Sequence, residues 1–453
     1  MRIQITSSPF IGTIVVVCIL ASNGLAQRFN PRDLGRSAAD IIRGLGTQAI
    51  REIPTPQDLL YTSIQLLVGL PEQTVVGIIN QACSLYLASG AINPRITPNI
   101  EEMYYQLRTP CKNISVPLQQ PEQLVNLPEF DVNKQVVIFV SGWGSDANSS
   151  YIQDFANAYN CRGDYNFVYI KTSDSIKTLY TWSAFNTEEV GDILAESLSQ
   201  LTEYIPVENI HLIGHSLGGQ IVGSAGRQFK NLTGQLLPRI TGLDPANPCF
   251  NEGESLEVIS RGDAEFVDIV HSNPGVLGKP QSLGDVDFYP NGKQAVKPGC
   301  VNFGCSHERS IRYFIETVYP GNERNFLAKR CNSLSGLNGG RCDGPEYPMG
   351  YAVPHDLKGD YYLNVNAEQP YGKNAPENAT VQPNELCAIA ANVVAQSVDF
   401  SAMAKSAASI IEGFGSQGSK QIPTPSQMFS IPVQVLIGFP EQVMFGVLNR
   451  ACE

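Results

Sequence analysis

The sequence is poor in positive charge, in histidine and in long apolar runs. It has 31 lysines and arginines against 43 aspartates and glutamates, a net charge of −12 over 453 residues. So acidic a chain is not expected to bind nucleic acid or to be captured electrostatically by an anionic membrane. The apolar run at 11–21 is too short and too close to the terminus for a membrane span, and no later run is long enough. We therefore expect no nucleic-acid partner and no transmembrane segment.

The first 26 residues have the pattern of a secretory signal peptide. Arg2 supplies a positive charge, residues 11–21 are apolar, and the Gly-Leu-Ala of 24–26 is a small-residue cleavage site. Eleven cysteines, less the one in the signal, leave ten, an even number that suits a disulfide-bonded secreted protein. Sequons that agree with export and glycosylation stand at Asn113, Asn148, Asn231 and Asn378. The sequence predicts a secreted, extracellular protein.

Beyond the signal, the chain divides into three parts. Residues 27–100 predict a helical extension interrupted by prolines, residues 101–372 alternate between strands and helices, and residues 373–453 form a tail. The tail repeats the extension, since 37–83 aligns without a gap on 406–452 with nearly half of the positions identical. The favoured interpretation is the start of a second, tandem copy cut off before its catalytic part. A second accessory helical segment is the alternative.

The central part has the pattern of an α/β protein. Its first strand, 135–141, reads Gln-Val-Val-Ile-Phe-Val-Ser, a nearly continuous apolar run typical of a parallel strand buried on both faces. Further strands are expected at 167–171, 210–213, 239–243, 266–271 and 284–290, and helices at 187–204 and 307–319. This alternation predicts a mostly parallel central sheet flanked by helices.

The stretch 210–220 organises this part of the chain. It reads strand, tight turn, helix, and the turn Gly-His-Ser-Leu-Gly fits the nucleophile-elbow pattern G-x-S-x-G around Ser216. Glycines flank the serine because a Cβ at either position would strike the neighbouring strand or helix. The alternative is a glycine-rich turn with an incidental serine. The strand before and the helix after the turn favour a nucleophile.

An ester hydrolase of this architecture needs an acid and then a histidine after its serine. Asp244 follows the next strand, where the alternative is a turn-forming Asp-Pro. Among the five histidines, His211 lies inside a strand, and the side chain of His215 should leave the elbow in another direction. His271 ends a strand and is expected to be structural, and the last histidine lies late in a Pro/Gly-rich region.

Elimination leaves His307 as the predicted general base. It would take the proton of Ser216, with Asp244 fixing its tautomer, and would then protonate the leaving alcohol. The oxyanion would be stabilised by the N–H of Leu217 and, from the turn after the first apolar strand, by the N–H of Trp143. The expected chemistry needs no cofactor.

Several motifs together resemble the pancreatic-lipase family, and the insect members, with venom phospholipases and yolk proteins among their relatives, are the most similar. The motifs are 213–219, 240–246, 267–272, 287–292 and 298–310. The resemblance covers 101–372 and implies an α/β-hydrolase fold, a triad of Ser216, Asp244 and His307, and an oxyanion hole from Trp143 and Leu217. It implies a secreted lipase or sn-1-specific phospholipase. An inert lipid-binding or yolk-type storage protein on the same fold is the alternative, although the yolk relatives have lost the serine that this chain retains.

The chain departs from the family pattern at four places. Ser141-Gly142 stands where the family usually has His-Gly, and Lys171-Thr172 stands where Asp-Trp is common. After Gly372 there is no counterpart of the vertebrate β-sandwich that engages colipase, so no such partner is expected. Acidic residues are sparse at 253–263, where some relatives bind calcium, so no metal is expected.

The resemblance also implies the disulfides Cys300–Cys305 and Cys331–Cys342. The first pair closes the lid in the family, but here only residues 301–304 lie between the two cysteines. Four residues tied at both ends cannot cover a lipid-sized cleft. We therefore expect an open mouth, a lipid substrate with its headgroup tolerated, and no interfacial trigger.

Overall fold

The computed structural model describes residues 98–143, 145, 147–172, 180–250 and 256–376. The predicted signal peptide, nearly all of the helical extension and both copies of the repeat lie outside these residues, as does most of the tail. The division of the chain at 26, 100 and 372 therefore stays a prediction. Within the described residues no helix is both long and apolar enough to cross a membrane.

An eleven-stranded sheet forms the centre of the described chain. From one edge to the other its strands are β2 (Asn113–Pro117), β1 (Tyr104–Arg108), β4 (Tyr165–Lys171), β3 (Gln135–Val140), β5 (Ile210–His215), β6 (Arg239–Leu243), β7 (Phe266–Val270), β8 (Val286–Pro290), β11 (Gly359–Leu363), β9 (Leu327–Arg330) and β10 (Glu346–Pro348). In this order across the sheet, each strand from β4 to β11 pairs in parallel with the next one. Antiparallel pairs occur at the two edges.

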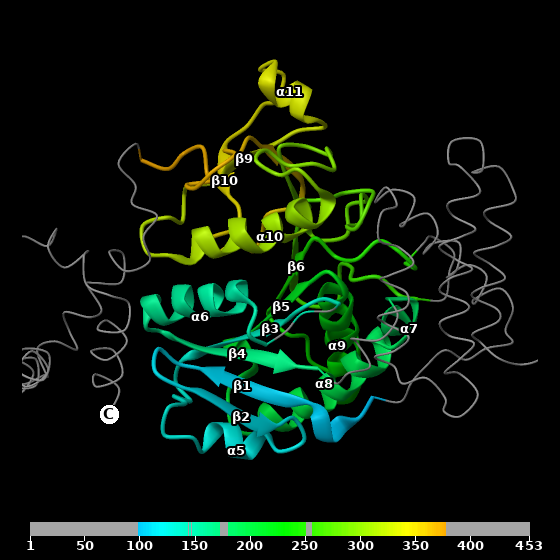
Figure 1. The fold of residues 1–453 in the computed structure, drawn as a ribbon, viewed down its shortest axis with the longest axis vertical. Helices are drawn as coiled ribbons and strands as arrows, with labels where there is room; N and C mark the ends of the chain where they lie inside the picture. Colours follow the sequence, from blue (N-terminus) through cyan, green and yellow to red (C-terminus); the bar gives the residue numbers. More distant parts are fainter. Residues whose placement is uncertain (1–97, 144, 146, 173–179, 251–255, 377–453) are drawn as a thin grey trace, which may run out of the picture. The chain divides into compact units, whose positions relative to one another are not determined.

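The six strands expected from the sequence are all present, with small shifts of their ends. The helices are α5 (Pro121–Val125), α6 (Ser150–Arg162), α7 (Tyr180–Phe185), α8 (Thr187–Leu201), α9 (Leu217–Thr233), α10 (Phe303–Val318) and α11 (Leu334–Asn338), with 3-10 turns at Ile100–Glu102 and Val207–Asn209. The predicted α/β-hydrolase fold, a mostly parallel sheet with helices on its faces, is confirmed (Figure 1).

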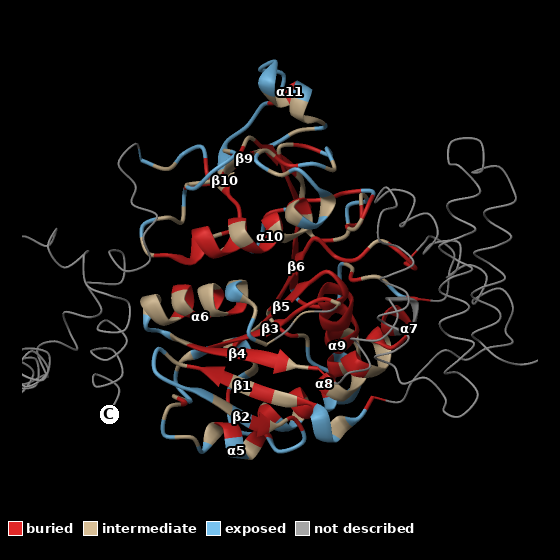
Figure 2. Cartoon of the chain, viewed as in Figure 1, coloured by how far each residue is buried: buried red, intermediate tan, exposed pale blue. Residues whose placement is uncertain are grey.

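Strand β3 shows how the sheet is covered on both faces. Because side chains alternate along a strand, Val136, Ile138 and Val140 enter one apolar cluster, which also contains the buried residues of α8 and α9. Phe139 points the other way and packs against Phe155 of α6, with ring centroids 5.0 Å apart. Figure 2 shows the central strands and most of α9 as buried. Burying each such side chain contributes roughly 2 kcal/mol, so this strand is fixed firmly between two helical layers.

The register of the parallel strands places the ends of β5, β6 and β7 side by side. His215 pairs with Leu243, and Leu243 pairs with Val270. The next residues along the three strands, Ser216, Asp244 and His271, therefore stand at one edge of the sheet. In open α/β sheets, ligands bind beyond this carboxyl edge.

Candidate active site

The turn between β5 and α9 holds Ser216 in a strained backbone conformation. Its φ of 56° and ψ of −122° lie in a region that L-residues rarely adopt. The main chain over-determines this geometry, because the Ser216 N–H donates to the Leu243 carbonyl at 3.1 Å. The Ser216 carbonyl accepts from the N–H groups of Gly219 and Ala246, both at 3.0 Å. The predicted elbow is therefore present, with the serine at its apex.

The glycines of the motif are needed because other backbone lies against them. A Cβ on Gly214 would be 2.2 Å from the Gly218 carbonyl oxygen. A Cβ on Gly218 would be 2.2 Å from the Val140 carbonyl oxygen and 2.7 Å from that of Ser141. These contacts join the elbow to the end of β3, so the spacing of the two glycines follows from close packing in the turn.

We expect Gly218→Ala to lower the free energy of unfolding by roughly 3 kcal/mol, because strand and helix must move apart. Urea unfolding followed by circular dichroism measures this change. The matched control is Gly304→Ala, whose Cβ would meet only the Asn302 Oδ1, at 3.6 Å. Equal stability of the two variants would show that the elbow is not tightly packed.

Asp244 and His307 lie in direct contact beside this turn. The His307 Nδ1 is 2.6 Å from Asp244 Oδ2. The aspartate is fully buried, and its carboxylate also accepts from the backbone N–H groups of Ser272, at 2.8 Å, and Asn273, at 3.0 Å. Burial alone would raise the pKa of Asp244, but the bond to His307 and the backbone donors bring this pKa below its ordinary value. The carboxylate is thus charged and fixed, able to hold the imidazole in one tautomer.

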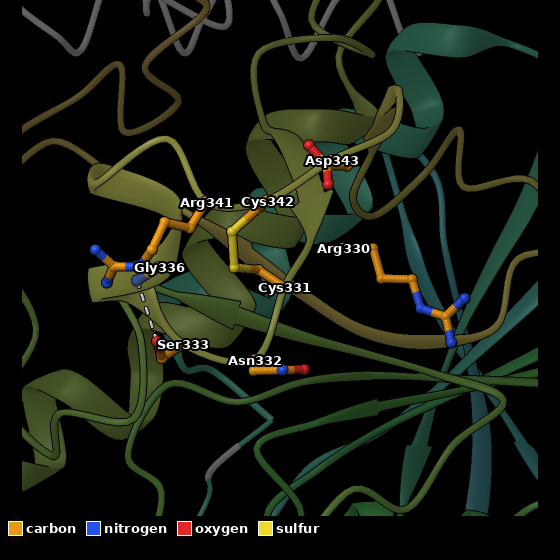
Figure 3. Close-up of a pocket in the computed structure, with 8 residues that line it drawn as sticks. All are labelled: Arg330, Cys331, Asn332, Ser333, Gly336, Arg341, Cys342 and Asp343. Carbon is orange, nitrogen blue, oxygen red and sulfur yellow. Dashed lines mark hydrogen bonds between the residues drawn. A yellow bond between two sulfur atoms is a disulfide. The ribbon is translucent and has the colours of Figure 1, made fainter.

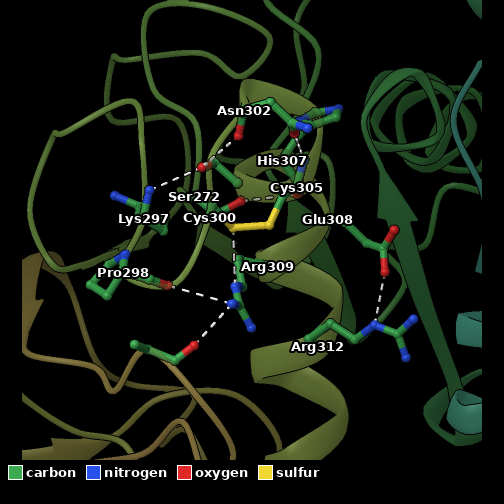
Figure 4. Close-up of a disulfide and its surroundings, with 12 residues drawn as sticks. Ser272, Lys297, Pro298, Cys300, Asn302, Cys305, His307, Glu308, Arg309 and Arg312 are labelled. Atoms are coloured by element: carbon green, nitrogen blue, oxygen red, sulfur yellow. Dashed lines mark hydrogen bonds and ion pairs between the residues drawn. A yellow bond between two sulfur atoms is a disulfide. The ribbon is translucent and has the colours of Figure 1, made fainter.

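His307 belongs to the first turns of α10, which begins at Phe303, four residues earlier than expected. The helix starts there because the Asn302 side chain caps it, with Oδ1 accepting from the Cys305 N–H at 2.7 Å. The predicted Cys300–Cys305 disulfide is confirmed and closes the loop in front of the cap (Figure 4). The second predicted disulfide, Cys331–Cys342, is also present.

A buried lysine stabilises the loop that leads into α10 through hydrogen bonds. The Lys297 Nζ donates to the carbonyls of Gly292, at 2.7 Å, and Gln294, at 2.9 Å, and its backbone N–H donates to Ser306 Oγ at 2.9 Å. Burial lowers the pKa of Lys297 to about 7. The loop is thus joined by hydrogen bonds to the first turn of the helix that carries His307.

His215, the residue before Ser216, lies closer to His307 than the sequence suggests. Its ring centroid is 4.5 Å from that of His307, and its Nε2 is 3.3 Å from the His307 carbonyl oxygen. Burial and the neighbouring His307 lower the pKa of His215 to about 3. An uncharged His215 does not repel a positive charge that forms on the His307 ring.

The three remaining histidines have structural partners. His271 is fully buried, stacks on Tyr289 at 4.5 Å and binds the Asp287 carboxylate at 2.8 Å, as a structural residue would. His211 contacts Thr241 Oγ1 at 2.8 Å. His355 stacks on the ring of Phe266. Within the described chain, His307 is the histidine that binds Asp244.

The end of β3 passes directly beside the serine. A Cβ on Gly142 would lie 2.6 Å from the Ser216 Cβ and 3.1 Å from its Oγ. The preceding Ser141, where the family usually has histidine, is buried and its hydroxyl is 3.0 Å from the Tyr169 hydroxyl. Trp143 follows and packs partly buried against the core, while Leu217 begins α9 and is fully buried. Of the two residues expected to form an oxyanion hole, Leu217 directly follows the serine, and Trp143 follows Gly142, which lies against it.

A cavity elsewhere in the described chain has no connection with these residues. It measures about 300 Å³, and the residues that line it include both cysteines of the Cys331–Cys342 disulfide, Arg330 and Arg341. Figure 3 shows Ser333 bound to the Gly336 N–H at its rim. None of the predicted site residues lines it. The described ranges also contain no group of three or more histidine, cysteine, aspartate or glutamate residues that could hold a metal ion.

Comparison with known proteins identifies the family. Residues 95–371 match the family model Lipase. Vitellogenin-1 of Ceratitis capitata is 38% identical over 51% of this chain and 53% of its own. Pancreatic lipase-related protein 2 of Cavia porcellus is 30% identical over 48% of this chain and 51% of its own. Lipoprotein lipase of Neovison vison is 32% identical over 53% of this chain and 57% of its own. The chain spans about half the length of these relatives. Because the family match covers more than half of this chain, the protein belongs to the Lipase family.

Proposed function

We propose that the protein is a secreted serine hydrolase of lipid esters, with Ser216, Asp244 and His307 as its triad. The observation that carries the proposal is the 2.6 Å contact between His307 and the buried Asp244, beside a serine at the apex of a nucleophile elbow. The lipase relatives support a lipid substrate. Export follows from the signal peptide expected at residues 1–26.

The geometry supports acyl transfer in two steps. The bond to Asp244 occupies Nδ1 of His307, so Nε2 is the nitrogen that takes the proton from the Ser216 hydroxyl. The serine oxygen bonds to the ester carbonyl carbon, and the carbon–oxygen bond to the leaving alcohol breaks as His307 returns the proton to that alcohol. Water, deprotonated by His307, then attacks the acyl-enzyme, releasing the fatty acid and restoring Ser216.

The oxyanion of each tetrahedral intermediate would lie between β3 and the start of α9. The close approach of Gly142 to Ser216 supports the N–H of Trp143 as one donor. The N–H of Leu217, at the beginning of a helix, is the second donor. Loss of one such donor typically costs about 3 kcal/mol of transition-state stabilisation.

A fluorophosphonate probe tests this proposal on the full-length secreted protein. An active serine hydrolase reacts covalently at Ser216, which intact-mass measurement and peptide mapping detect. Hydrolysis of a soluble short-chain ester by the same preparation gives the rate. Labelling at another residue would contradict the choice of nucleophile.

The similarity to Vitellogenin-1 favours a second candidate function, an inert lipid-binding or storage protein on the same fold. The same experiment separates the two. An inert protein would bind lipid but would neither react with the probe nor hydrolyse the ester.

We expect no jump in rate at the critical micelle concentration of a phospholipid or a simple glyceride. The loop closed by Cys300 and Cys305 holds four residues, of which Phe303 and Gly304 already belong to α10, and Val301 is 95% exposed. So short a loop cannot swing aside at an interface. Hydrolysis of the first acyl ester, measured against substrate concentration through this threshold, is the test. A sharp rise there, with negligible turnover of monomers, would mean that another segment acts as a lid.

A further inference from the structure

The backbone carbonyl of His307 accepts hydrogen bonds from three side chains. Ser272 Oγ and Ser310 Oγ both donate to it at 3.0 Å, and His215 Nε2 approaches it at 3.3 Å. The Ser310 bond stays within α10, three residues along the same helix. The other two side chains come from the ends of β7 and β5. The base is therefore tied to the sheet through its main chain as well as through its ring.

Ser272 is the residue that joins the two halves of the Asp244–His307 pair. Its backbone N–H donates to Asp244 Oδ1 at 2.8 Å, while its hydroxyl donates to the His307 carbonyl. The residue is fully buried, so water does not compete for either bond. Figure 4 shows Ser272 facing the first turn of α10. Ser272 thus fixes the position of the Asp244 carboxylate relative to the backbone of His307.

We propose that Ser272 is a positioning residue that holds His307 in line with Asp244 through the hydrogen bond from its hydroxyl to the His307 carbonyl. The inference rests on the proposed function, because it concerns the same triad. Without the hydroxyl, the first turn of α10 can shift relative to the end of β7. The imidazole moves with its backbone, and a misplacement of about 1 Å in a reacting group can cost about 100-fold in rate.

His215 makes the second contact between the sheet and the His307 carbonyl. To donate to a carbonyl its Nε2 must carry the proton, which leaves Nδ1 as an acceptor, and this Nδ1 is buried with no hydrogen-bond partner among the described residues. Because His215 also precedes the nucleophile, its bond couples the position of Ser216 to that of His307. At 3.3 Å this contact is longer than the Ser272 bond, so Ser272 is the better residue to test.

The test compares Ser272→Ala with Ser310→Ala. Both variants remove one buried serine hydroxyl that donates at 3.0 Å to the same carbonyl oxygen. Only Ser272 connects that carbonyl to β7, and its backbone bond to Asp244 survives the substitution. We expect Ser272→Ala to lower kcat about tenfold with KM unchanged, and Ser310→Ala to change kcat less than twofold. Equal effects of the two variants on kcat would overturn the proposal.

A proton NMR measurement tests the same point without turnover. The His307 Nδ1–H that bonds to Asp244 should give a low-field resonance, and we expect Ser272→Ala to speed its exchange with water while Ser310→Ala does not. Unchanged exchange in Ser272→Ala would also overturn the proposal. If the wild-type protein hydrolyses no ester, the proposed function fails, yet the exchange rates still decide whether Ser272 positions the base.

Discussion

Replacing Ser216 with alanine is expected to lower kcat by about four to six orders of magnitude and to leave the fold and secretion intact. The side-chain oxygen is the proposed nucleophile, so its removal leaves no atom to carry the acyl group. The main-chain bonds that shape the elbow run from Ser216 to Leu243, Gly219 and Ala246, and alanine retains all of them. Alanine also keeps the Cβ, so the backbone strain at this position is little changed.

The measurement uses a soluble short-chain ester, so that binding to an interface does not limit the rate. Circular dichroism and urea unfolding should give a free energy of unfolding within about 0.5 kcal/mol of the wild-type value. The variant should also fail to react with the fluorophosphonate probe. Activity close to that of the wild-type protein would remove Ser216 from the mechanism.

The central strands could be predicted from the sequence because they are buried on both faces. Strands β3 and β5 read as apolar runs, which is the pattern that a parallel sheet covered by helices requires. Strands β1 and β2 were missed. Buried and partly buried residues mix along β1, only one residue of β2 is buried, and the two strands form one of the two antiparallel edges of the sheet. β1 and β2 pair with each other across residues 109–112, but β1 joins the sheet through β4, a partner distant in sequence that local patterns do not reveal.

The candidate site was predictable where it depends on strand ends. Ser216 and Asp244 follow directly after β5 and β6, so the order of apolar runs was enough to place them at one edge. Elimination led to His307, which lies against Asp244 in the structure, and its role as the general base stays a prediction. The early start of α10 had a signal in the sequence, since Asn302 is a residue type that caps helices.

The contacts around His307 could not be predicted in the same way. His215 was expected to point away, yet its ring lies 4.5 Å from that of His307. The two bonds of Ser272 depend on a side-chain rotamer and on the distance between β7 and α10, which are set by packing. Sequence spacing indicates which residues reach an edge of the sheet, but not which of their polar atoms meet.

His307→Ala should reduce kcat about as much as Ser216→Ala, and the double variant should be no worse than either single one. A serine with no base attached cannot lose its proton readily, and a base with no serine has nothing to activate, so the residues of a triad act as one unit. Asp244→Asn should cost about four orders of magnitude, because an amide facing His307 Nδ1 favours the wrong tautomer.

His271→Ala is the matched control for the choice of base. It removes a buried histidine that also binds an aspartate, Asp287, and follows the strand next to β6. Because its ring stacks on Tyr289 and binds Asp287, and neither Asp244 nor His307, the loss should appear in the free energy of unfolding, by roughly 2 kcal/mol, with kcat of the folded fraction retained. Multiplicative losses in the double variant of Ser216 and His307 would mean that the two residues act separately. If His271→Ala were stable but inactive while His307→Ala stayed active, the general base would be His271 and not His307.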